Sequence, residues 1–136
     1  MRVFKMSKEN SDEQLEDYKD FKMNENFNGI DIVNPKNSNS IYIVNDIIVK
    51  NPEENNIINI YGCNLNEDET EEVMESINLQ DDDVLLFHKE EIMKDRSINI
   101  LNKDYFIILP GASLVIEFVN YDKKLNLRVH SYKEEL

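Results

Sequence analysis

The sequence predicts a mainly β domain of the α+β class, built as an antiparallel β-sandwich or a jelly-roll-like domain. Roughly seven or eight short segments rich in Ile, Val, Phe and Tyr alternate apolar with polar residues, as strands with one buried face do. Turn-forming residues, mainly Asn, Asp, Pro and Gly, separate these segments. Two other segments have the spacing of helices, so we expect a short N-terminal helix and one short acidic helix beside the strands.

The length of 136 residues fits one domain, residues 1–136. We expect residues 1–28 to form a helical N-terminal segment and residues 29–136 a β-rich core with an acidic insert at 64–83. A chain of this length can bury a core without a disulfide or a structural metal. Its one cysteine, Cys63, cannot form an intramolecular bridge, which indicates a reducing compartment.

The first helix is predicted over residues 11–20, because Ser11 is a good N-cap and Gln14 follows three residues later, as in a capping box. The second is predicted from Asp68 or Thr70 to residue 77. Its apolar residues fall on one face, and acidic residues fill its first turn, where the helix dipole favours them.

Strands are predicted over residues 29–33 and 57–61. Between them, residues 41–44 and 47–50 are two β-rich runs separated by Asn45-Asp46. Two polar residues at this position are typical of a tight hairpin, and one long strand with a bulge is the alternative.

The last third of the chain is predicted to be β-structure. Residues 84–88, 98–101 and 105–109 have strand character, and Pro110-Gly111 is a strong turn signal. Residues 114–119 and 125–130 both alternate apolar with polar side chains, so we expect them to pair as a hairpin.

Acidic residues dominate the middle of the chain. The net charge is -13, and nearly all of the excess lies in residues 53–95. Such a band repels nucleic acids and anionic membranes and attracts basic protein surfaces, so we expect no direct nucleic-acid binding and no membrane binding. It is either a solvated face, a docking face for a basic partner or a mimic of a nucleic-acid backbone. The candidate partner-binding residues are Glu67, Asp68, Glu69, Glu71, Glu72, Glu75, Asp81, Asp82 and Asp83.

No residue pattern indicates catalysis, a cofactor or a metal, so we expect a protein that is not an enzyme. Cys63 could combine only with His88 or His130, and its sequence neighbours offer nothing that would lower the pKa of its thiol. The oxygen-bearing residues from Asn64 to Glu75 match the ligand positions of a calcium loop. Glu69 stands where that loop needs glycine, so a capped acidic helix is the favoured interpretation and a cation the alternative.

One part of the sequence resembles a known family. Residues 106–118, with Leu109-Pro110-Gly111 at their centre, and residues 125–129 resemble the closing hairpin of tailed-phage distal tail and related baseplate proteins. Residues 58–62 resemble a strand-glycine unit earlier in the same β-sandwich domain. The resemblance covers residues 57–130. It implies a non-enzymatic virion part whose surfaces contact neighbouring subunits.

These observations predict a non-catalytic structural or interaction protein, such as a component of a phage virion tail or baseplate, whose edge strands suit oligomeric assembly. The alternative is a small acidic inhibitor, either an immunity protein or an anti-defence antagonist, that binds a basic nuclease-type partner. An enzyme or metal protein is a weaker third hypothesis. Because no signal peptide and no membrane-spanning run is evident, we expect a cytoplasmic or virion location.

Overall fold

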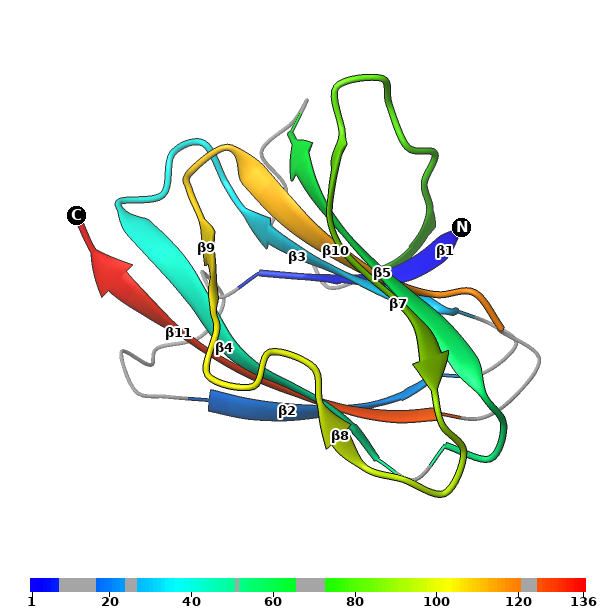
Figure 1. The fold of residues 1–136 in the computed structure, drawn as a ribbon. Helices are drawn as coiled ribbons and strands as arrows, with labels where there is room; N and C mark the ends of the chain where they lie inside the picture. Colours follow the sequence, from blue (N-terminus) through cyan, green and yellow to red (C-terminus); the bar gives the residue numbers. More distant parts are fainter. Residues whose placement is uncertain (8–16, 24–26, 51, 66–72, 121–124) are drawn as a thin grey trace.

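The chain folds into two β-sheets that face each other across a shared apolar core (Figure 1). The computed structural model describes residues 1–7, 17–23, 27–50, 52–65, 73–120 and 125–136. Every element found in these ranges is a strand, and none of the described ranges contains a helix. The prediction of a mainly β protein is therefore confirmed.

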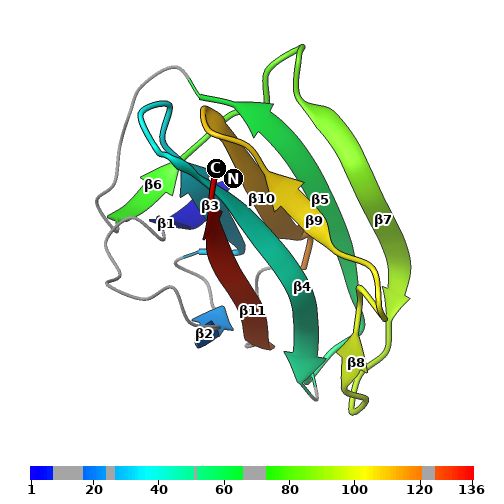
Figure 2. The same ribbon diagram turned by 90° about the vertical axis from the view of Figure 1, so that its left-hand side faces the viewer.

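Among the described residues, sheet A has six strands and sheet B has five. The order in sheet A is β6 (Val73–Ser76), β1 (Arg2–Met6), β3 (Gly29–Asn34), β10 (Ala112–Phe118), β5 (Asn56–Asn64) and β7 (Val84–Ile92). The order in sheet B is β2 (Asp17–Met23), β11 (Leu125–Glu135), β4 (Ser40–Lys50) and β8 (Ile98–Asn99), and β9 (Phe106–Ile108) also pairs with β4. All pairs are antiparallel except β1 with β3. Figure 2 shows β7 as the outermost strand of sheet A.

The core lies between the sheets, where alternate residues of each strand meet. Sheet A contributes Ile30, Ile60 and Ile116, each 0% exposed. Sheet B contributes Val44 and Leu127, which are equally buried. Because side chains alternate between the two faces of a strand, the residues between these point outward, and the outer faces are where a functional site can form.

Both predicted helices are wrong where the structure describes the chain. Residues 17–20 belong to β2, which pairs along its whole length with β11 and buries Phe21 and Met23. Residues 73–76 form β6 and pair with β1. Residues 8–16 and 66–72, on which the rest of both predictions fell, lie outside the described ranges. Pairing with a distant strand overrides a local helical pattern, because helix propensity is a weak preference.

Residues 40–50 form one long strand with a bulge, so the hairpin predicted at Asn45-Asp46 is wrong and its alternative is confirmed. His130 of β11 pairs with Asp46, and the next residue, Ser131, pairs with Val44. Asn45 is therefore the extra residue of a β-bulge, which restores the inward direction of the apolar residues on either side of it.

The hairpin predicted from residues 114–119 and 125–130 does not form. β10 pairs with β3 and β5 in sheet A, whereas β11 pairs with β2 and β4 in sheet B. The predicted apolar faces are correct, since Leu114 and Leu127 are both buried. They meet across the core instead of side by side.

The turn predicted at Pro110-Gly111 is confirmed. The Ala112 amide donates to the Leu109 carbonyl, with 3.1 Å between N and O, and Gly111 has a φ of 85°. A glycine adopts this conformation without strain. The turn carries the chain from β9 in sheet B to β10 in sheet A. No helix in the described ranges has the length and apolar character needed to cross a bilayer.

Candidate functional site

A polar cavity of about 320 Å³ lies on the outer face of sheet A. The pairing of the strands arranges the residues of the cavity floor in two rows that run across sheet A. In the first row Lys5 pairs with Asp31 and Asp31 pairs with Val115. In the second row Ser113 pairs with Cys63. Directly paired residues point to the same side of a sheet, so these charged and polar groups gather on one face.

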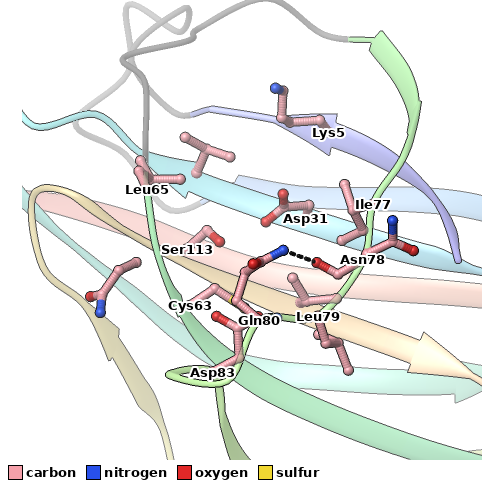
Figure 3. Close-up of a pocket in the computed structure, with 13 residues that line it drawn as sticks. Lys5, Asp31, Cys63, Leu65, Ile77, Asn78, Leu79, Gln80, Asp83 and Ser113 are labelled. Carbon is pink, nitrogen blue, oxygen red and sulfur yellow. Dashed lines mark hydrogen bonds between the residues drawn. The ribbon is translucent and has the colours of Figure 1, made fainter.

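Residues 77–83, here called the covering loop, form one wall of this cavity (Figure 3). The Ile77 amide donates to the Met1 carbonyl at 2.9 Å and fixes one end of the loop. At the other end the Gln80 amide donates to a carboxylate oxygen of Asp83 at 2.6 Å. The Gln80 side chain donates to the Asn78 carbonyl at 3.1 Å. Lys5 and Asp31, which line the same cavity, are only 7% and 6% exposed although they lie on the outer face.

The cavity keeps its one thiol protonated. Burial raises the pKa of Cys63 to about 12, and the nearby carboxylates of Asp83 and Asp31 act in the same direction. A hydrogen bond from Ser113 opposes them only in part. The thiolate is the nucleophile in cysteine chemistry, so this environment disfavours nucleophilic catalysis.

Three of the predicted acidic residues have described side chains. Asp81 and Asp82 are exposed, and Asp82 accepts a hydrogen bond from Asn64 at 3.3 Å. Asp83 turns inward and lines the cavity. Glu75 lies in β6, of which the backbone is described. The candidate residues outside the described ranges are Glu67, Asp68, Glu69, Glu71 and Glu72.

The calcium-loop alternative falls mostly on residues 66–72, which lie outside the described ranges. Its first position, Asn64, is an exposed residue at the end of β5. No group of three or more His, Cys, Asp and Glu side chains that could hold a metal ion occurs in the part of the chain that the structure describes.

The two histidines lie on opposite outer faces. His88, in sheet A, hydrogen-bonds the Asn59 side chain. Asn59 is four residues from Cys63 along β5, which is roughly 13 Å in a strand. His130, in sheet B, pairs with Asp46 at 3.1 Å. The two histidines are therefore not close to each other, and His88 is not close to the Cys63 thiol.

Sequence reasoning missed two surface features. The β7 patch consists of Val84, Leu85 and Leu86, which are 56%, 52% and 48% exposed. A continuous apolar run of this kind is typical of a buried strand, and only the position of β7 at the sheet edge exposes it. The second feature is a groove of about 680 Å³ on the outer face of sheet B. No sequence pattern signals the groove, because its residues come from three separate segments, residues 41–46, 99–107 and 132–134.

Comparison with protein-family models, with curated proteins and with solved structures found no match to this chain.

Proposed function

We propose that the chain is a non-catalytic structural protein that assembles with other subunits through the β7 patch, as a component of a virion tail or baseplate would. The exposure of the β7 patch carries this proposal. Three consecutive apolar side chains, each about half exposed, leave apolar surface on both faces of this edge strand, and burial of that surface against a partner would be favourable. The patch lies on β7, one of the two edge strands of sheet A, where a neighbouring subunit can reach it.

The proposed contact would be made by apolar side chains rather than by backbone hydrogen bonds to a further strand. The register of β7 against β5 shifts twice, and Leu86 is the extra residue at one of the shifts. Bulges at a sheet edge hinder the addition of a further strand, because they interrupt the ladder of hydrogen bonds. Charged residues, among them Lys89 and Glu90, occupy the second half of the strand and limit the apolar contact to its first half.

Other observations support the narrower assignment. The two-sheet arrangement is compatible with a jelly-roll-like sandwich, although the closing hairpin on which the resemblance to distal tail and baseplate proteins rested does not form. The protonated state of Cys63 supports a non-catalytic role.

The double variant Leu85→Ser/Leu86→Ser tests the proposal. Sedimentation velocity should find the native chain as an oligomer and the variant as a monomer, because the apolar contact has been removed. Since both side chains are about half exposed, the variant should still fold. The control Leu109→Ser/Val119→Ser changes exposed apolar side chains elsewhere and should remain oligomeric. Dissociation of the control to the same extent would show that the β7 patch has no special role.

A second candidate function, an acidic inhibitor of a basic nuclease-type protein, is favoured by the position of Asp81 and Asp82. Both are exposed in the turn that leads directly into the β7 patch. An apolar contact beside exposed acids suits a basic partner, which the acids would steer. Inhibition assays with a panel of basic nucleases test it. Inhibition that the variant Asp81→Asn/Asp82→Asn weakens would support this function, and no inhibition of any nuclease would count against it.

A further inference from the structure

The groove on the outer face of sheet B has an apolar floor set by strand register. Tyr132 of β11 pairs with Ile43 of β4, and Ile43 pairs with Ile107 of β9. The three side chains therefore form one row across three strands. Ile107 is 50% exposed and Ile43 is 9% exposed, so the floor is open to solvent at its Ile107 end. The exposed Tyr105 stands beside it in the groove wall.

The end of the groove is held rigidly by the bulge in β4. Asp46 accepts a hydrogen bond from the Asn99 side chain at 2.6 Å, and its other carboxylate oxygen lies 3.1 Å from Nδ1 of His130. The side-chain oxygen of Asn99 in turn accepts from the Ile47 and Leu101 amides, each at 3.2 Å. These bonds fix the segment after β8 above the sheet. The wall is thus preformed, which lowers the entropic cost of binding a ligand.

Acidic side chains flank the apolar floor. The charged residues that line the groove are Asp46, Asp104, Glu134 and Lys103, so acids outnumber bases by three to one. Glu134 pairs with Ile41, and Asp46 pairs with His130, which lies four residues before Glu134 along β11. Measured along the strands, the two acids are therefore roughly 13 Å apart, at about 3.3 Å per residue. The apolar row through Ile43 lies between them.

We propose that this groove binds an extended peptide segment of a partner protein in which two basic residues flank one apolar residue. In an extended chain, residues i, i+2 and i+4 point to the same side, and i and i+4 are roughly 13 Å apart. A basic–x–apolar–x–basic segment thus places its apolar side chain on the Ile43 row and its two cations near Glu134 and Asp46. A second copy of this chain fits less well, because its net charge of -13 opposes an acidic rim.

Saturation-transfer NMR with the full chain and a blocked Lys-Ser-Ile-Ser-Lys peptide tests this proposal, whatever the oligomeric state. The strongest transfer should reach the isoleucine methyl groups. The peptide Lys-Ser-Ser-Ser-Lys lacks the apolar anchor, and Glu-Ser-Ile-Ser-Glu reverses the charges. Each should bind at least about fivefold more weakly. No transfer to the first peptide, or equal binding of the serine peptide, would overturn the proposal.

Variants of the protein test whether the peptide binds in this groove. Ile107→Ser should weaken the binding of Lys-Ser-Ile-Ser-Lys about tenfold, because it removes one end of the apolar row. Glu134→Gln changes an exposed side chain and should weaken it severalfold even if Ile107→Ser disturbs the fold. Leu86→Ser, on the opposite sheet, should leave binding unchanged. Binding that survives both groove variants would place the peptide elsewhere and overturn the proposal.

Discussion

At the residue scale, position in the register decides what each polar side chain does. Cys63 and His130 are both on outer faces, yet the covering loop half-buries the first and the Asp46–Asn99 network fully buries the second. The alternating pattern correctly predicted that Ile116 and Val129 are buried. It could not reveal the burial of His130, because that depends on a bulge in another strand and on the segment after β8.

The environment of Cys63 predicts slow alkylation. At pH 9 a thiol with the ordinary pKa of 9.0 is half ionised, whereas a pKa of about 12 leaves roughly one thiol in a thousand ionised. Iodoacetamide at pH 9 should therefore react at least about 100-fold more slowly with the native chain than with the urea-unfolded chain. Asp83→Asn should speed the native reaction, because it removes one negative charge beside the thiol. Asp81→Asn is the control. Equal rates for native and unfolded chains would contradict this account.

The same shift predicts how stability depends on pH. The folded state holds the Cys63 proton more tightly than the unfolded state. The contribution of this thiol to the free energy of unfolding is therefore complete below pH 9 and is lost as the pH rises towards about 12. Urea midpoints should fall over this range. They should fall less in Cys63→Ser, which has no thiol to ionise. An identical slope for both proteins would contradict the raised pKa.

At the element scale, alternation located the strands but could not choose their partners. Residues 114–119 and 125–130 have the same pattern whether they pair side by side or face each other across a core, and here they face each other. Residues 73–76 looked helical because nothing local indicates that β1 lies beside them. The two polar residues Asn45 and Asp46 indicated an interruption of the strand, but the sequence could not decide between a bulge and a hairpin turn.

The bulge in β4 predicts an unusual deletion tolerance. Removing Asn45 leaves Tyr42, Val44 and Ile47 pointing inward, because the extra residue alone interrupts their alternation against β11. The free energy of unfolding should change by no more than about 1 kcal/mol. Deleting Ile43 should cost at least about 2 kcal/mol, since Tyr42 or Val44 must then turn outward. Urea denaturation of the two variants compares them. Equal losses would show that the bulge is needed for the fold.

At the scale of the whole molecule, charge and apolar surface act against each other. The net charge of -13 makes copies of the chain repel, while burial of the β7 patch in the proposed assembly would favour their association. Salt screens repulsion between surface charges and leaves apolar contacts largely intact. The overall β class and the acidic band were readable from the sequence. The exposed position of β7 was not, because it depends on the order of all six strands of sheet A.

The mass of the native chain in solution tests assembly through the β7 patch most directly. Light scattering coupled to size-exclusion chromatography should find a closed oligomer of the 16.1 kDa chain at moderate salt. Smaller species should increase at low salt, because repulsion is then less screened. A monomer at both salt concentrations and at every protein concentration would contradict the proposed assembly.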